Sequence, residues 1–478
     1  MKFRPHVLTL TMAALLIAGC ATYYQKTLRF QEYVMGGDME KAQSWLEKND
    51  KDSKGKNRLL YYMYRGWVNW MTGDFDASNR DLEVADLMIE DEHKQVGYEA
   101  LSLISNPGVK PYRAEDFEKV MVNYFKALNY IQSGNHEGAI VEARRMIIRL
   151  QKLNDQYKDR KNRYSDDAFA HVIIGMMYDA DRDYNNAFIA YRNALKAYEE
   201  VYEGNFGLSA PEQLRKDILR TAYLTGFYDE VAHYEKLFGM EYRHRDPEGG
   251  ELVVIWQNGF GPVKSEWSIN FTILPGEAGF VTFVNEEYGL TFPFYIGDRS
   301  PGEQAQLRDL SILRVAFPKY LERQPVFTGA SLVWEGSNTP LELAENLNDI
   351  AFKTLQDRML RELGNALLRV ATKRALEVAA REATKGSSKE NKLDAGDIAP
   401  AAITIMNAIT EKADTRNWQT LPHSIYYARI NLPAGKKQLS LKTTGPGAAR
   451  SHELEVEIRK NQTTFFVLQS LESKLPAN

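Results

Sequence analysis

Residue types that could do chemistry are scattered along this sequence and do not gather in catalytic spacing. The chain has 478 residues with eight histidines and one cysteine, so neither an internal disulfide nor a site built on two thiolates can form. No Gly-x-Ser-x-Gly elbow, His-Glu-x-x-His motif, phosphate-binding loop or dinucleotide fingerprint occurs in it. We therefore expect no catalytic residues, no metal ligands and no cofactor.

Asp414, Arg416 and Trp418 are the best candidate for a specific structural or binding loop. An acid and a guanidinium pair readily, and a guanidinium also stacks on aromatic rings. We expect these residues to form a buried lock between a helix and the last β module. A ligand-binding loop is the alternative.

Cys20 has chemistry of a different kind. Lys2 and Arg4 precede an apolar run from Val7 to Ile17 that is shorter than the about 20 residues of a membrane-spanning helix. The ending Leu16-Ile17-Ala18-Gly19-Cys20 resembles the bacterial lipoprotein signal, in which the cysteine carries the lipid. That resemblance implies a signal peptide at 1–19 and lipid attachment at Cys20. Because Ala21 follows, it also implies a palmitoylated, outer-membrane lipoprotein that faces the periplasm.

Three segments share a pattern of small and aromatic residues that resembles the tetratricopeptide repeat (TPR), a 34-residue helix–turn–helix. Their turns are Gly73-Asp74-Phe75, Gly134-Asn135-His136 and Asp183-Tyr184, and weaker copies lie at Gly37-Asp38 and Gly226-Phe227-Tyr228. Each turn is flanked by small residues, such as Gly66 and Gly175, that let two helices approach closely. The pattern predicts a TPR-like array over 20–245.

Arrays of this kind offer a concave groove to a protein partner. By the usual register, the predicted groove residues are Trp67, Trp70, Tyr124, Ile131, Met176 and Asp179, joined by Arg144 and Arg145. The alternatives are that the aromatic residues pack against inserted helices and that the two arginines belong to a salt-bridged helix face.

After the array, the hydrophobic period changes. Short β-branched and aromatic runs predict a β domain at 249–340, and four more predict a β-sandwich-like module at 413–478. Between them, 341–412 has helical periodicity, with a flexible linker near 386–398 and a basic stretch at 353–385 that either lies on a membrane or forms a solvated face. The fold class predicted is α+β multidomain.

Composition and net charge exclude some classes of function. Hydrophobic residues at 44% and charged residues at 26% are typical of globular chains, and a net charge of −4 argues against a nucleic-acid binder. Together with Asp414 to Pro422, the signal and repeats resemble a little-characterised family of proteobacterial repeat-containing outer-membrane lipoproteins, often encoded beside lipoproteins like penicillin-binding-protein activators. The resemblance implies a role in envelope assembly. An anchor and a recognition array without a catalytic constellation predict a non-enzymatic scaffold that binds a protein partner in cell-envelope or secretion-system assembly. A peptidoglycan- or glycan-binding or glycan-processing protein and a purely structural brace are the alternatives; the oligomeric state is left open.

Overall fold

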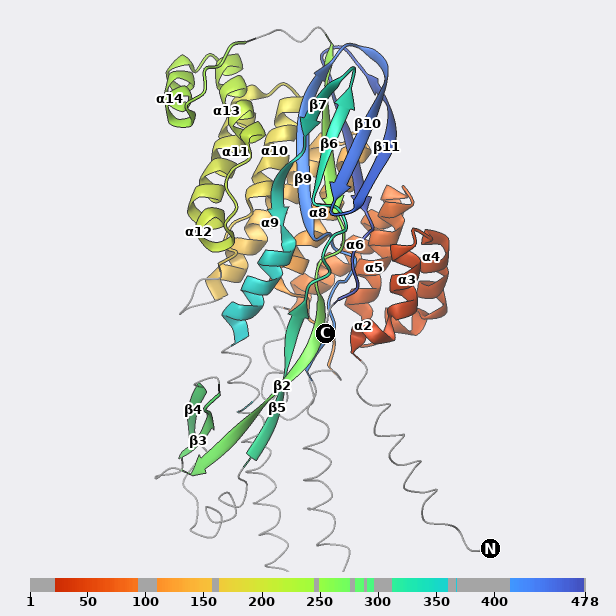
Figure 1. Cartoon of the computed structure of the whole chain (residues 1–478), viewed down its shortest axis with the longest axis vertical. Coiled ribbons are helices and arrows are strands. Elements are labelled where there is room, and N and C mark those ends of the chain that lie inside the picture. Colours follow the sequence, from red (N-terminus) through yellow and green to blue (C-terminus); the bar gives the residue numbers. More distant parts are fainter. Residues whose placement is uncertain are drawn as a thin grey trace, which may run out of the picture.

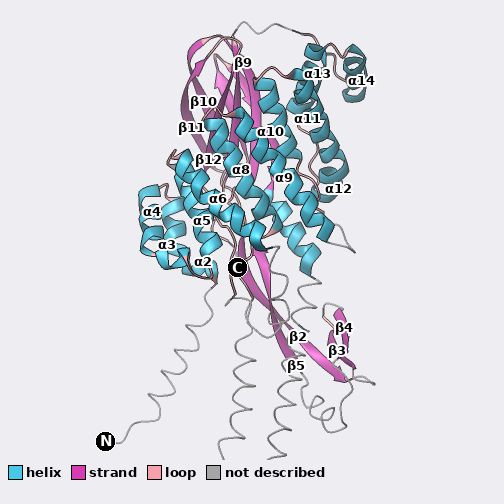
Figure 2. Ribbon diagram, turned by 180° about the vertical axis from the view of Figure 1, so that it is seen from behind, coloured by secondary structure: helices cyan, strands magenta, loops and turns pink. Residues whose placement is uncertain are grey.

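The structure is a computed structural model that describes residues 22–92, 110–156, 163–244, 249–275, 280–287, 290–295, 312–359, 367 and 413–476. The predicted signal peptide, Cys20, the linker near 386–398 and most of the basic stretch lie outside these residues. Helices cover one side of the described body and strands the other (Figures 1 and 2).

Five helical hairpins follow one another and form the helical layer. They are α3 (Leu28–Met35) with α4 (Met39–Lys48), α5 (Arg58–Met71) with α6 (Phe75–Glu92), α8 (Asp116–Gln132) with α9 (His136–Gln156), α10 (Ala168–Ala180) with α11 (Tyr184–Ala197), and α13 (Glu212–Thr225) with α14 (Tyr228–Phe238). Shorter elements are α2 (Tyr23–Lys26), η1 (Asp50–Ser53), η4 (Tyr198–Tyr202) and α12 (Glu203–Phe206). The helical pairs predicted from the repeat pattern are confirmed.

The hairpin turns share the same backbone conformation. A residue with positive φ reverses the chain in each of them, namely Gly37, Gly73, Gly134, Arg182 and Gly226. In four of the five hairpins an Asp or Asn then caps the second helix, namely Asp38, Asp74, Asn135 and Asp183. A side-chain oxygen at this position satisfies an N–H that would otherwise have no partner in the helix.

Small residues hold the two helices of a hairpin close. A Cβ atom at Gly66 would lie 2.7 Å from Leu82 Cγ, and one at Gly175 would lie 2.4 Å from the Tyr191 ring. Both distances are shorter than van der Waals contact, so glycine is required where the repeat pattern has it.

Eight strands form two sheets beside the helices. We call the sheet with the order β12–β1–β9–β8 sheet A. The other sheet has the order β11–β10–β6–β7. The strands are β1 (Gly250–Asn258), β6 (Gly329–Trp334), β7 (Ser337–Pro340), β8 (Glu342–Asn346), β9 (Ser424–Leu432), β10 (Gly435–Gly445), β11 (Ala448–Ile458) and β12 (Thr463–Ser470).

The sheets correct the predicted division between 249–340 and 413–478. β1 of the first segment lies between β9 and β12 of the second, antiparallel to β9 and parallel to β12, and β10 pairs with β6. The strands of the two predicted units therefore form one sandwich. The expected helix after 341 also begins later, because Glu342–Asn346 is strand β8, which pairs with β9; residues 347–359 are helical.

The sandwich lies directly on the helical layer. Alternate residues of β1 belong to two different cores: Val253 and Ile255 pack with the helices, whereas Leu252, Val254 and Trp256 pack between the two sheets. This alternation is what a strand that is buried on both faces requires.

A third sheet, with the order β4–β3–β2–β5, extends away from the body (Figure 1). Its strands are β2 (Val263–Pro275), β3 (Phe280–Asn285), β4 (Leu290–Tyr295) and β5 (Ile312–Leu321).

Candidate functional site

The predicted groove is filled by the chain itself. Six of the eight predicted groove residues are no more than 5% exposed, namely Trp67, Trp70, Tyr124, Ile131, Met176 and Asp179. The expectation that they face an open groove is therefore wrong. The physical reason is that sheet A and the segment 413–422 occupy that side of the helices and remove the aromatic surface from water.

Contacts from three successive hairpins demonstrate this filling. Trp67 of α5 donates its indole N–H to Gln469 of β12 at 3.1 Å. The ring centroid of Phe125 of α8 lies 5.6 Å from that of Trp418, and that of Phe169 of α10 lies 6.0 Å from that of Tyr427 of β9. Packed rings of this kind stabilise an interface beyond the area that they bury.

The segment with Asp414, Arg416 and Trp418 lies between helices and sheets. Arg416 forms an ion pair with Asp414 at 2.6 Å, and its guanidinium lies 5.5 Å from the Tyr112 ring centroid. Trp418 is buried, and its backbone N–H donates to Glu118 Oε1 of α8 at 2.6 Å. Arg416 and Trp418 thus contact the helical layer, and Asp414 pairs with Arg416 inside the segment.

Glu115 and Glu118 form a buried acid pair next to this segment. Lys264 forms an ion pair with Glu115, and Arg358 reaches the other Glu115 oxygen at 2.5 Å. Burial opposes ionisation, but the two cations outweigh it and lower the pKa of Glu115 to about 2. Burial raises the pKa of Glu118, which accepts from Tyr112.

Arg323 is a fully buried cation that bonds to neutral groups. It donates to the Gly261 carbonyl at 2.8 Å, to Gln31 Oε1 at 3.2 Å and to the Gln419 carbonyl. Among the described residues it has no carboxylate partner, and burial lowers its pKa to about 10. Arg323 thus ties α3, the β1–β2 connection and the 413–422 segment to one point.

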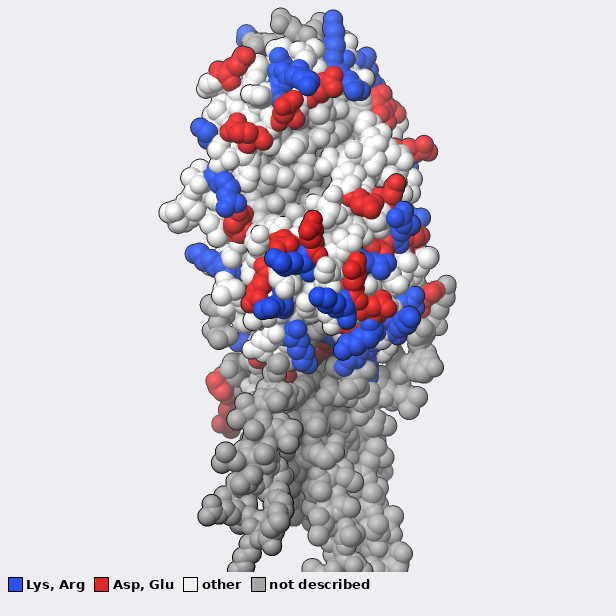
Figure 3. Space-filling model, turned by 90° about the vertical axis from the view of Figure 1, so that its right-hand side faces the viewer, with Lys and Arg blue, Asp and Glu red and all other residues white. Residues whose placement is uncertain are grey.

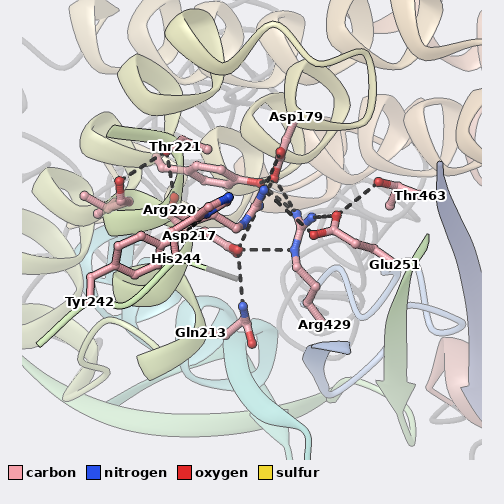
Figure 4. A network of polar contacts seen from close by, with 12 residues as sticks. Asp179, Gln213, Asp217, Arg220, Thr221, Tyr242, His244, Glu251, Arg429 and Thr463 are labelled. Carbon is pink, nitrogen blue, oxygen red and sulfur yellow. Dashed lines mark hydrogen bonds and ion pairs between the residues drawn. The ribbon is translucent and has the colours of Figure 1, made fainter. Parts of the chain in front are cut away.

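A second junction lies where α10, α11 and α13 meet β1 and β9 (Figure 4). Arg429 of β9 contacts Asp179 at 3.0 Å, Asp217 at 3.2 Å and Glu251 at 2.5 Å, and its guanidinium donates to Tyr191 Oη at 3.0 Å. Arg220 pairs with the same three carboxylates.

This network has one more carboxylate than it has guanidinium groups. The Oδ2 atom of Asp217 has no hydrogen-bond partner, and burial raises the pKa of this residue. Buried charges are tolerated when they are paired. Because these ion pairs join α10 and α13 to β1 and β9, the network fixes the end of the helical layer against sheet A. Sequence reasoning singled out only Asp179 of this group; the others carry no local signal, because their partners lie far away in the sequence.

Arg144 and Arg145 lie on the outer side of the layer, on α9. Arg144 is exposed and donates to Tyr178 Oη at 2.5 Å, with its guanidinium 5.8 Å from that ring centroid. Arg145 pairs with Glu142 at 3.1 Å, as the alternative of a salt-bridged face predicted.

Two apolar side chains flank Arg144 on the same stripe of α9. Val141 is 45% exposed and Ile148 is 48% exposed, and their positions three residues before and four residues after Arg144 place them on one helix face. We call Val141, Arg144, Ile148 and Tyr178 the outer stripe. The expectation that Arg144 and Arg145 face the groove is therefore wrong, because both side chains are exposed on the outer side of α9.

No protein-family model matches the chain, and no curated protein matches it at a significant level. Among solved structures, it is similar to BtubC (BKLC) from P. vanneervenii, at 14% identity over 46% of this chain and 83% of that one, with a TM-score of 0.30. It is also similar to MamA AMB-1, at 16% identity over 45% and 87% with a TM-score of 0.27, and to the apo form of RapI, at 16% over 47% and 64% with a TM-score of 0.23. Likeness of this degree assigns neither a family nor an activity.

Two further properties hold for the part of the chain that the structure describes. None of its helices combines the length and apolar character that crossing a membrane requires. Within the same residues, no three His, Cys, Asp or Glu side chains gather so that they could hold a metal ion.

Proposed function

We propose that this protein is an outer-membrane-anchored periplasmic lipoprotein that serves as a non-catalytic scaffold in cell-envelope or secretion-system assembly. The cysteine of the signal-like ending Leu16 to Cys20 supports the anchor. The helical hairpins support a role in recognition, because stacked hairpins present extended surfaces to partners.

The outer stripe is the observation that carries the proposal. Because the inner side of the helices is filled by the chain's own sheet, a protein partner has to bind elsewhere. The stripe offers two large aliphatic side chains beside an arginine that is held over a tyrosine ring. Arginine and tyrosine are enriched among the residues that dominate binding energy, and apolar neighbours exclude water around them.

The test is affinity purification of the full-length protein from cells after chemical crosslinking. We expect a stoichiometric envelope protein that is lost when Val141 and Ile148 are both changed to Asp. The control is Leu237→Asp on α14, which places the same charge on a side chain that is 55% exposed at the end of the array. Recovery of the lipoprotein alone, or equal loss with the control, contradicts the proposal.

Two further measurements separate the proposal from its rivals. Mass spectrometry of the mature protein detects acylation, which Cys20→Ser abolishes if Cys20 is the lipid site. A pull-down with insoluble peptidoglycan uses the whole chain, because β1 shares a core with the helices. Strong retention on peptidoglycan favours the glycan-binding alternative.

A further inference from the structure

The sandwich has four outermost strands, and three of them carry features that prevent further pairing. β11 carries Arg450, Glu453, Glu455 and Glu457, all exposed, and β7 has four residues and ends at Pro340. β8 contains two glutamates and an irregularity in its register between Leu343 and Glu345. Charges, proline, shortness and bulges are the devices by which natural proteins protect sheet edges.

β12 has none of these devices. Its eight residues, Thr463–Ser470, read TTFFVLQS and contain neither a charge nor a proline. Within the described residues it pairs with β1 alone. Five of its side chains are half-buried, so the strand is not enclosed. An uncharged edge rich in β-branched and aromatic residues is a ready template for another strand.

The hydrogen bonds at its two ends determine which amides point outward. The carbonyl of Gln462 accepts from Glu251 and that of Ser470 from Gly259, so even-numbered residues direct their backbone groups toward β1. Because successive residues of a strand alternate in direction, Thr463, Phe465, Val467 and Gln469 direct theirs to the free edge.

Three hairpins contact this strand and the turn that precedes it, at positions four residues apart. Arg182 of the α10–α11 turn donates to the Asn461 carbonyl at 2.7 Å, the His136 ring centroid of the α8–α9 hairpin lies 6.0 Å from that of Phe465, and Trp67 of α5 bonds to Gln469. β11 borders the other side, where its Glu457 carbonyl accepts from the Thr464 hydroxyl at 3.2 Å. The edge is therefore framed on both sides.

The strand itself is uncharged, although the exposed Arg182 and Glu457 lie beside its N-terminal end. Figure 3 views the side of the molecule that carries β11 and the N-terminal helices. A hollowed, uncharged stretch lies there between charged groups above it and the charged helices below it. A charged side chain packed against the uncharged side chains of β12 would lose hydration without gaining a partner there.

We propose that β12 accepts an extended, uncharged segment of a protein partner as an additional strand of sheet A. This inference rests on the proposed scaffold function and specifies a second way of binding. Backbone hydrogen bonds from the outward amides provide affinity, and alternate side chains of the segment provide specificity. The open part of the edge is its first half, Thr463 to Phe466, whereas Val467, Gln469 and Ser470 are buried.

The first test is hydrogen exchange at single-residue resolution on the lipidated protein in mild detergent. We expect the amides of Phe465 and Val467 to exchange at least about tenfold faster than those of Phe466 and Leu468, because the latter pair with β1. Equal protection of all four amides would mean that the edge is already covered, and this result overturns the proposal.

The second test uses benzoylphenylalanine as a photocrosslinking probe in cells, placed at Thr464 and separately at Phe466. The crosslinked segment is expected to be uncharged, with attachment points two residues apart in one partner, as strand pairing requires. Attachment to a second copy of this chain, attachment at helical spacing, or no crosslink overturns the proposal.

Thr464→Lys adds a charge at the edge and should reduce the crosslink yield from Phe466 by about tenfold. Thr444→Lys, an exposed position on β10, is the matched control and should have no effect. If the Val141 and Ile148 variant loses its partner whereas Thr464→Lys changes nothing, the scaffold function stands and the edge proposal fails.

Discussion

Trp67 and Gln469 are 402 positions apart in the sequence and are joined by a hydrogen bond of 3.1 Å. The bond links a residue on the inner side of the helical array to the last strand of the chain. The side amide of Gln469 also donates to the carbonyls of Gly259 and Thr420. The helices, the β1–β2 connection and the 413–422 segment therefore meet at one side chain.

This relationship predicts that Gln469→Leu destabilises the whole protein. The substitution leaves the Trp67 N–H and two carbonyl groups without their partner in a buried place, and each unsatisfied group costs about 1–3 kcal/mol. We expect a loss of at least about 1 kcal/mol in the free energy of unfolding, measured with urea. Gln438→Leu on the exposed face of β10 should change it by less than about 0.5 kcal/mol. Equal effects would show that Gln469 is not buried at this junction.

The network around Arg429 predicts an asymmetry between its positive and negative members. Arg429→Met strands Asp179, Asp217 and Glu251 beside Arg220 alone, and breaking a buried pair in this way costs about 3–5 kcal/mol. Asp217→Asn removes the surplus carboxylate and should cost less than about 1 kcal/mol.

Thermal unfolding of both variants measures this asymmetry, with Arg459→Met, at an exposed ion pair, as the control. If Asp217→Asn is as damaging as Arg429→Met, the network is not short of positive charge.

The hairpins were predictable because their signals are local. A turn such as Gly134-Asn135 contains both the residue that adopts positive φ and the residue that caps the next helix. Strands such as Thr463–Ser470 were equally visible, since β-branched and aromatic residues stand together.

The order of the strands was not predictable, because it depends on pairs between distant segments. β1 and β12 are parallel partners more than 200 residues apart, and neither sequence specifies the other. For the same reason the exposure of the groove residues was predicted wrongly. Trp67 shows the same sequence pattern whether a partner or the chain's own strand covers it. Arg429 gave no signal, because an arginine within a strand does not reveal three distant carboxylates.

Glu345 predicts a stability that falls as the pH rises. It lies on β8 at 2% exposure, and both of its oxygens accept from the Tyr202 hydroxyl at 3.0 Å. Burial, reinforced by Asp167, raises the pKa of Glu345 well above its usual value of 4.5. The folded protein then keeps the proton while the unfolded chain loses it, so stability is complete below pH 4.5 and decreases as the pH rises toward the folded pKa.

Glu345→Gln keeps the neutral form at every pH. At pH 8 we expect the variant to be more stable than the parent protein by roughly 1–3 kcal/mol, a range taken from the cost of burying polar groups, and near pH 4.5 the difference should vanish. Urea unfolding across this pH range measures it, with Glu453→Gln on exposed β11 as the control. A difference that does not change with pH would contradict a raised pKa.

The close contact between Gly175 and Tyr191 predicts that Gly175→Ala destabilises the protein. The Cβ of Gly175→Ala would lie 2.4 Å from the Tyr191 ring, so α10 and α11 must separate or the ring must move away from Asp179, to which its hydroxyl donates at 3.1 Å. Overpacking of this kind costs about 1–3 kcal/mol. Gly204→Ala in α12 is the matched control, because no atom lies within 4 Å of its Cβ; alanine there should be neutral or stabilising by about 0.5–1 kcal/mol. Equal stabilities of the two variants would mean that the hairpin is looser than the repeat requires.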